Sequence, residues 1–132
     1  MSAQAVHDTI SARLATAGYP VQWMGGTLTD MTAPEFLRLM ITAVSRQNLF
    51  LNDNSDARIR GMVVVDCFSP LGAGMSRVHQ IADEVADLFQ REDRLTAGDA
   101  LIYFPHGAFV RSPMATGSRA QVTVQAGYEV FQ

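Results

Sequence analysis

The sequence predicts an α+β fold, in which a mixed, mostly antiparallel β-sheet carries an N-terminal helix and a central helix at about residues 75–90. Three observations lead to this prediction. A β-branched run at residues 63–65 is followed closely by an amphipathic helical pattern, short apolar segments follow that helix, and residues 119–131 alternate between apolar and polar side chains. The chain of 132 residues is expected to form a single domain over residues 1–132.

The first predicted element is a helix over residues 4–17. The apolar residues that recur at every fourth position on one helical face are Val6, Ile10 and Leu14. Gly18 supplies a typical C-terminal stop, and the pair Tyr19-Pro20 prevents the helix from continuing. A short extended segment is expected next, over residues 21–24.

The apolar segment at residues 34–44 fits two structures. Thr32 and Glu35 have the spacing of a capping box with Pro34 in the first turn, which favours a helix. The same segment also alternates as a strand would. Leu, Met, Arg and Ala are better helix formers than strand formers, so local evidence alone favours the helix.

A polar loop is predicted over residues 46–56. Three consecutive apolar residues interrupt it: Leu49, Phe50 and Leu51. Such a run can tuck beneath the loop or contact a partner, because exposed apolar patches usually mark contacts. Asp53 and Asp56 precede Arg58 and Arg60, and these arginines fit either an electrostatic contact patch or a plain polar entry to the next strand.

The central strand is predicted over residues 59–68, and it ends at Ser69-Pro70 because proline cannot donate a hydrogen bond to a sheet. Both faces are apolar in the middle, so the strand is expected to be covered at least partly on both sides. One face carries Ile59, Gly61, Val63, Val65 and Cys67, and the other carries Arg60, Met62, Val64, Asp66 and Phe68.

The central helix follows at once. Its apolar residues recur at three- and four-residue steps and are Met75, Val78, Ile81, Ala82, Val85, Leu88 and Phe89. Asp83, Glu84 and Asp87 fall on the other side, where a solvated helix face explains them better than paired catalytic carboxylates.

The rest of the chain is predicted as connections and strands. A charged connection covers residues 91–99, short strands cover 101–104 and 108–111, and a Gly/Ser/Thr loop covers 114–118. The terminal strand at 119–131 has one buried face, with Val122, Val124, Ala126, Tyr128 and Val130. Its other face is wet and includes Glu129.

Composition excludes several kinds of chemistry. All ten basic residues are arginine, so a Walker-type phosphate loop, a Schiff base and a lysine general base are not available. The net charge of −3 disfavours a nucleic-acid-binding surface, and we expect no sequence-specific nucleic-acid recognition. The sequence shows neither a signal peptide nor an apolar run of the roughly 20 residues that span a bilayer, so no membrane partner is expected.

Two small constellations suggest catalysis or ligand binding, and each has a simpler explanation. Gly72-Ala73-Gly74 stands between a strand and a helix, as in dinucleotide-binding turns, but Arg77 takes the place of the third glycine. Cys67, His79 and His106 could form a nucleophile and base, but free cysteine within an apolar strand is usually a small buried hydrophobe. We expect no enzyme, no cofactor and no metal site. The alternatives are a small nucleotide-binding α/β domain that uses the glycine turn and a cysteine-dependent enzyme.

A longer pattern carries a family resemblance. An Arg-x-Arg-Gly entry at Arg58 leads into Met-Val-Val-Val-Asp, Phe-Ser-Pro and Gly-x-Gly, and then into an amphipathic helix that ends at Phe89. An N-terminal helix, an aromatic-bearing extended piece, a proline-led apolar segment and a polar loop precede this run, and a long alternating strand ends the chain. In this order and in these patterns the chain resembles the tail terminator proteins of long-tailed bacteriophages.

The resemblance implies a small α+β subunit that forms a ring, a homohexamer, on the end of the tail tube. The ring would stop tube polymerisation and offer a surface to the head–tail connector. The implied partners are further copies of the chain, the tail tube protein and the connector protein. The implied location is the head-proximal end of the virion tail, reached from the host cytoplasm during assembly.

The resemblance also implies that residues 36–44 form a strand, and we follow it there against the local evidence. It carries over no catalytic residues. Interface residues are expected mainly in the two longest polar connections, 46–56 and 114–118, and at the arginines beside them. The candidate interface residues are Arg46, Leu49, Phe50, Leu51, Asp53, Arg58, Arg60, Met114 and Arg119.

Overall fold

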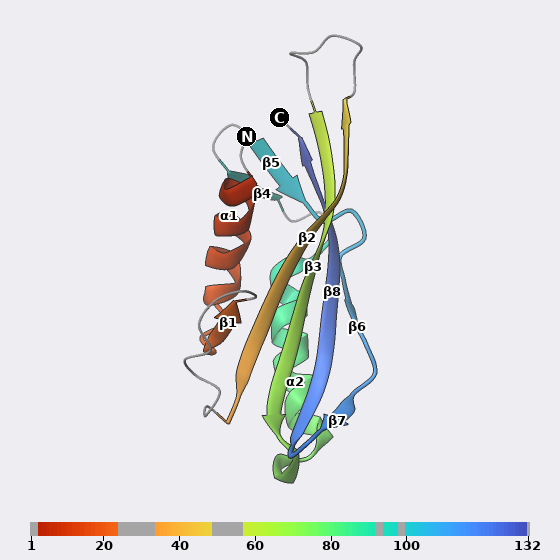
Figure 1. The fold of residues 1–132 in the computed structure, drawn as a ribbon. Helices are drawn as coiled ribbons and strands as arrows, with labels where there is room; N and C mark the ends of the chain where they lie inside the picture. The colour runs from red at the N-terminus through yellow and green to blue at the C-terminus, as the bar shows by residue number, and fades with distance from the viewer. Residues whose placement is uncertain (1–2, 24–33, 49–56, 92–93, 98–99, 132) are drawn as a thin grey trace.

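The computed structural model describes residues 3–23, 34–48, 57–91, 94–97 and 100–131, and it shows an α+β fold (Figure 1). The elements in chain order are α1 (Ala3–Ala15), β1 (Val21–Trp23), β2 (Phe36–Asn48), β3 (Ala57–Pro70), the short helix η1 (Leu71–Ala73), α2 (Met75–Ala86), the short helix η2 (Asp87–Phe89), β4 (Arg94–Ala97), β5 (Ala100–Tyr103), β6 (Ala108–Val110), β7 (Met114–Thr116) and β8 (Arg119–Phe131). The predicted fold class is confirmed. None of the described helices is long and apolar enough to cross a membrane.

The sheet is built around β3. Its strands follow the order β1-β2-β3-β8-β5-β4, and β6 and β7 also pair with β8. β3 is antiparallel to β2 on one side and to β8 on the other, while β1 is parallel to β2. The far edge of β8 is shared by β5, β6 and β7, which pair with successive parts of it from its C-terminal to its N-terminal end.

The core lies between the two helices and one face of the sheet, called here the inner face. On β3 this face carries Val63, Val65 and Cys67, and on β8 it carries the alternating apolar residues that the sequence predicted. The buried helical residues that complete the core are Val6, Ile10 and Leu14 from α1 and Val78, Ile81, Ala82 and Val85 from α2. Both helices therefore cover the same face of the sheet.

Residues 36–48 form strand β2, so the family resemblance predicted this segment correctly and the local helix propensities did not. Leu37 and Leu39 are buried directly opposite Cys67 and Val65 of β3. Helix propensities differ by a few tenths of a kcal/mol per residue. Burying a leucine side chain contributes about 1.5–3 kcal/mol. Packing against β3 therefore outweighs the local preference.

Three segments predicted as connections contribute strands instead. β2 continues through residues 46–48, β4 occupies part of the charged connection, and β7 occupies most of the segment 114–118. Each of them is one arm of a hairpin, paired to β3, β5 or β8 respectively. These segments are strands because they pair with a neighbouring strand, not because one of their faces is buried. Their sequences therefore show little hydrophobic periodicity.

An ion pair ties the start of β2 to α2. The Arg77 guanidinium donates to both carboxylate oxygens of Glu35, at 2.9 Å for the Nη2–Oε1 pair. The Tyr19 hydroxyl donates to Glu84 of α2, and Arg77 Nη2 lies 3.4 Å from the Tyr19 oxygen. Arg77, which replaces the third glycine of a dinucleotide-binding turn, is therefore a structural residue that holds the strand and the helix together.

This ion pair predicts an acid-sensitive contribution to stability. The hydrogen bond from Arg77 lowers the pKa of Glu35 from its ordinary value. Because the folded pKa lies below the unfolded one, the stabilisation is present above the ordinary pKa of glutamate and is lost as the pH falls through the lowered value. We expect Glu35→Gln to lower the denaturation midpoint at about pH 7 and to lose this deficit as the pH falls through and below the lowered pKa of Glu35. A deficit of constant size over that range would contradict the assignment.

Candidate functional site

The predicted interface residues that the structure describes fall at two ends of the long strands rather than on one surface. Four of them lie outside the described residues: Leu49, Phe50, Leu51 and Asp53. Arg46 and Arg58 lie on the β2–β3 hairpin near its end, which projects from the top of the view in Figure 1. Met114 and Arg119 lie at the opposite end of the sheet, where β7 pairs with the start of β8. The structure does not bring these two groups together.

Arg60 is tied into the sheet by Glu129. Its Nε donates to Glu129 Oε1 at 2.9 Å, and the Tyr103 hydroxyl donates to Glu129 Oε2. Both partners stand directly opposite Glu129, on β3 and β5. The prediction of a wet Glu129 was wrong: the residue is 7% exposed, because these two neighbours satisfy its carboxylate.

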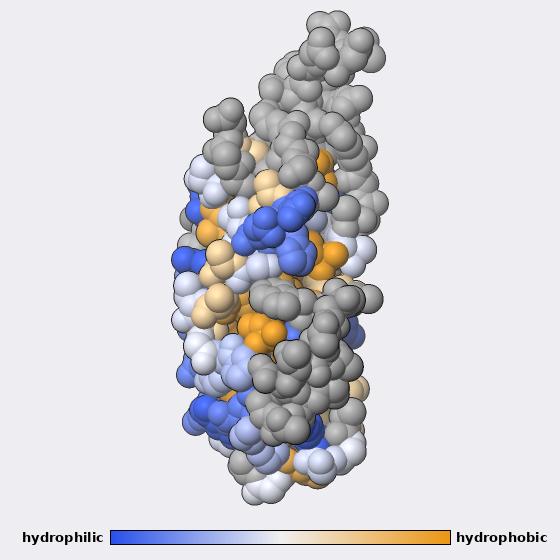
Figure 2. Space-filling model, turned by 60° about the vertical axis from the view of Figure 1, so that its left-hand side comes forward, coloured by the Kyte–Doolittle hydropathy of each residue, from blue (hydrophilic) through white to orange (hydrophobic). Residues whose placement is uncertain are grey.

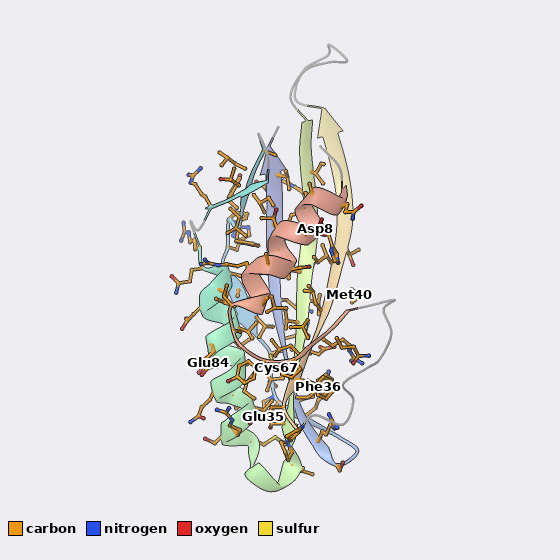
Figure 3. The ribbon with its side chains drawn as sticks, turned by 90° about the vertical axis from the view of Figure 1, so that its left-hand side faces the viewer. Asp8, Glu35, Phe36, Met40, Cys67 and Glu84 are labelled. Atoms are coloured by element: carbon orange, nitrogen blue, oxygen red, sulfur yellow. The ribbon has the colours of Figure 1, made fainter. Side chains whose placement is uncertain are left out.

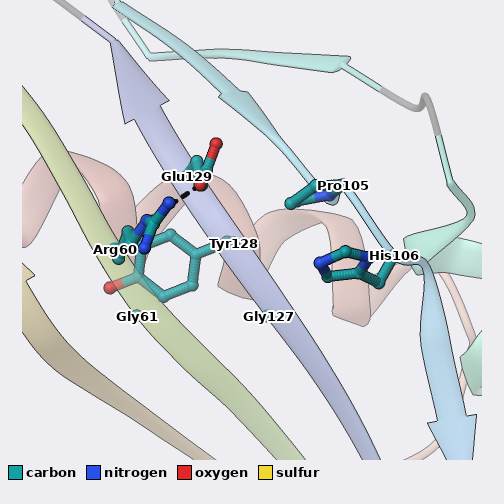
Figure 4. A pocket seen from close by; sticks show the side chains of 7 residues that line it. All are labelled: Arg60, Gly61, Pro105, His106, Gly127, Tyr128 and Glu129. Carbon is teal, nitrogen blue, oxygen red and sulfur yellow. Dashed lines mark hydrogen bonds and ion pairs between the residues drawn. The ribbon is translucent and has the colours of Figure 1, made fainter.

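An open pocket of about 230 Å³ lies beside this ion pair (Figure 4). Seven residues line it: Arg60, Gly61, Pro105, His106, Gly127, Tyr128 and Glu129. Figure 4 shows His106 across the pocket from the Arg60–Glu129 pair. The carboxylate already has two partners, so the pocket offers no free acid–base pair. The described part of the chain also holds no group of side chains suited to a metal ion.

The other end of the sheet carries a packed aromatic cluster on the outer face. Phe36 and Phe68 stand opposite each other and stack with ring centroids 4.6 Å apart. The guanidinium of Arg119 lies 4.6 Å from the Phe36 ring centroid, and that of Arg38 lies 5.2 Å from the Phe68 centroid. Arg119 is therefore in contact with an aromatic ring of its own subunit. A guanidinium at this distance from a ring face is attracted to it in a cation–π interaction.

The exposed apolar residues gather along another part of the molecule. Phe109 is 62% exposed and Met114 is 55% exposed, on the neighbouring short strands β6 and β7. Met75, which the sequence placed on the buried helix face, is exposed at the start of α2. Among the described residues, the other exposed large apolar side chains are Val110 of β6, Leu71 beside the start of α2, and Leu101 of β5. Leu101 lies apart from the rest, because β5 pairs with the C-terminal end of β8. Sequence reasoning identified Met114 but missed Phe109, which it treated as an ordinary strand residue.

The structure does not favour the two alternatives, a cysteine-dependent enzyme and a small nucleotide-binding domain. Cys67 is fully buried on the inner face, and burial raises the pKa of its thiol to about 12, so the reactive thiolate is disfavoured. The glycine turn forms η1, and Gly74 adopts a φ of 82° before α2. The strand that precedes this turn is flanked by antiparallel strands on both sides. A dinucleotide site instead requires the parallel sheet of a doubly wound fold.

Comparisons with known proteins identify a family. A protein-family model described as phage tail terminator protein matches residues 3–128. One solved structure matches with a TM-score of 0.80 and 21% identity, covering 98% of this chain and 96% of its own. A chain from the virion of a native gene transfer agent particle matches with a TM-score of 0.58 and 14% identity, covering 98% of this chain and 93% of its own. At these identities the two structures establish the shared fold alone. Among curated proteins, none matches the sequence significantly.

Proposed function

This chain belongs to the phage tail terminator family, and from that membership we propose that it caps the tail tube as a ring and ends tube growth. The chain is a structural protein of the phage tail. The observation that carries the proposal is the extent of the family match, which covers residues 3–128. In this proposal residues 1–132 act as one domain.

A ring can end polymerisation without chemistry. In a closed cyclic assembly every heterologous contact is satisfied, so the ring cannot itself grow into a filament. One face of the ring would match the last ring of the tube, and the other would offer no further tube-binding surface. The partners would be five further copies in a homohexamer, the tube protein and the head–tail connector protein. The ring would sit at the head-proximal end of the tail, after assembly in the host cytoplasm.

We assign the tube or connector contact to the end of the β2–β3 hairpin. This end projects beyond the helices, as Figure 1 shows. The candidate contact residues are Arg46 and Arg58 on the two strands and, in the sequence between these strands, Leu49, Phe50, Leu51 and Asp53. Arg60 lies two residues after Arg58 on β3, and its side chain is half-exposed beside Glu129. A projecting hairpin can reach a neighbouring ring without any rearrangement of the core.

The proposal is tested by adding the purified chain to its cognate tube protein during polymerisation. We expect shorter tubes than in its absence, with a disc at one end only, as seen by electron microscopy. Excess protein that leaves tube lengths and tube ends unchanged would refute the capping function.

A shortened hairpin tests the contact residues separately. Asn48 and Ala57 are paired, so replacing residues 49–56 by Asn-Gly should close the hairpin with a two-residue turn and keep the sheet. We expect this variant to keep its unfolding midpoint and to lose capping. Asp83→Ala, on the exposed side of α2, is the matched control and should keep both properties. Full capping by the shortened variant would place the contact elsewhere.

A further inference from the structure

The border of the sheet formed by β6 and β7 combines exposed apolar side chains with open strand edges. We define the β6–β7 edge by Phe109, Val110, Arg111 and Met114, whose exposures reach 62% at Phe109, 38% at Val110 and 55% at Met114. Phe109 and Met114 stand opposite Gln125 and Gln121 of β8, so both belong to the outer face of the sheet. Val110 stands opposite the buried Val124, and so it belongs to the inner face. The edge is thus apolar on both of its sides.

The backbone of this edge also has an open side. β8 is the only described strand that pairs with β6 or β7. The Arg111 N–H donates to Thr123 O at 2.9 Å, so the alternation of an antiparallel pair directs the backbone groups of Val110 away from β8. Exposed edges with large apolar side chains are unfavourable in a free subunit, and they typically mark contact sites.

The β6–β7 edge is basic as well as apolar. The sequence contains no acidic residue between Asp99 and Glu129, whereas it contains Arg111, Arg119 and His106 in that interval. Arg111 is exposed, and its Nη1 lies 3.3 Å from the neutral Oε1 of Gln125. None of the described carboxylates pairs with it. A partner surface that fits this edge should therefore be acidic and partly apolar.

The opposite side of the same subunit carries two exposed carboxylates and a partly exposed methionine. Figure 3 views that side, with Asp8 on α1, Glu84 on α2 and Met40 on β2, and we call these three residues the acidic flank. The Asp8 side chain is 66% exposed, with His7 Nδ1 at 3.7 Å, and Glu84 accepts a hydrogen bond from the neutral Tyr19 hydroxyl. Met40 lies on β2 just beyond the stretch that β1 covers. Figure 2 shows hydrophilic residues mixed with smaller apolar areas when this side is turned forward.

We propose that the β6–β7 edge of one copy docks on the acidic flank of the next copy. The proposal rests on the proposed ring and specifies which surfaces close it. Arg111 would face a carboxylate of the acidic flank, while Phe109 and Met114 would cover apolar area near Met40. Because the two surfaces differ, and Figure 1 shows β6 and β7 at the right of the sheet and α1 at its left, the contact is head-to-tail, which is the arrangement that generates closed rings.

Two blocked variants test this contact in the intact chain. The edge-blocked variant carries Phe109→Asp and Met114→Asp, and the flank-blocked variant carries Asp8→Arg and Glu84→Arg. A cooperative unfolding transition in each variant shows that it folds. The midpoints of the two variants are compared with each other, because assembly itself stabilises the wild type. Arg111→Glu provides a second edge variant that changes only charge. Oligomeric mass is measured by analytical ultracentrifugation, and pairwise binding is measured by capture on a tagged edge-blocked copy.

We expect the wild type to assemble and each blocked variant alone to lose all assembly beyond the monomer. The tagged edge-blocked copy, whose flank is intact, should capture the flank-blocked copy but not an untagged edge-blocked copy. Normal assembly of either blocked variant would overturn the proposal, as would the absence of capture. Dimers of the flank-blocked variant alone would also overturn it, since they indicate an edge-to-edge contact.

Tube capping is measured separately from self-assembly, so that the proposed function and the proposed contact can be tested independently. A wild type that caps tubes but remains monomeric in free solution would overturn this contact and leave the capping function standing. A wild type that forms rings through this contact but leaves tube length unchanged would overturn the capping function alone.

Discussion

Ile81→Ala is expected to lower the free energy of unfolding by about 2–5 kcal/mol, the range observed when a large buried aliphatic side chain is truncated. Ile81 has no solvent exposure and belongs to the same core as Val63 and Val65 of the central strand. α2 packs directly on β3 and β8, so the surrounding backbone has little freedom to close the resulting cavity.

Chemical denaturation measures this effect, since the midpoint should fall while the slope of the transition stays constant. Asp83→Ala is the matched control in the same helix, because Asp83 is exposed and such substitutions usually change stability by less than about 0.5 kcal/mol. A midpoint that barely moves for Ile81→Ala would show that this face of α2 does not support the core.

Gly61→Ala is expected to destabilise the fold by about 1–3 kcal/mol, the cost of overpacking a filled site. Gly61 stands opposite Tyr128, whose ring lies across the glycine. An added Cβ would lie 2.3 Å from both Cζ and Oη of Tyr128, well inside any tolerated contact. The ring would have to move, and it is part of the buried core.

The neighbouring glycine provides a close control for this substitution. At Gly127 an added Cβ would meet only the Gly61 carbonyl oxygen, at 3.9 Å, so Gly127→Ala should cost much less than Gly61→Ala. Combining Gly61→Ala with Tyr128→Ala should cost less than the sum of the two single changes, which a double-mutant cycle measures. Equal costs at the two glycines would show that the ring does not set the requirement at Gly61.

Elements with a buried face could be predicted from the sequence. The four-residue spacing of Val6, Ile10 and Leu14 gave α1, and the strict alternation of residues 119–131 gave β8, because burial imposes its period on both kinds of element. The same reasoning gave β3 and its central place in the sheet. Strand β2 required the family resemblance, since its residues favour a helix locally and become a strand only against β3.

Features that depend on distant partners could not be predicted. Nothing near Glu129 in the sequence indicates that Arg60 and Tyr103 stand opposite it and allow its burial. The strand at Phe109 was predicted, but its exposure depends on whether another element covers β6, which no local pattern records. The same limit explains why β4 and β7 were taken for connections.

The position of β8 has a consequence for the order of folding. β3 can pair with β2 through a local hairpin, but its other edge pairs with β8, with Arg58 opposite Phe131. Contacts between residues so distant in sequence form late, because the intervening chain must first lose its conformational freedom. During synthesis the central strand therefore keeps one edge unpaired until residues 119–131 have left the ribosome. A chain cut before Arg119 lacks an inner strand of the sheet rather than an outer one, and with it the pairing partner of β3, β5, β6 and β7.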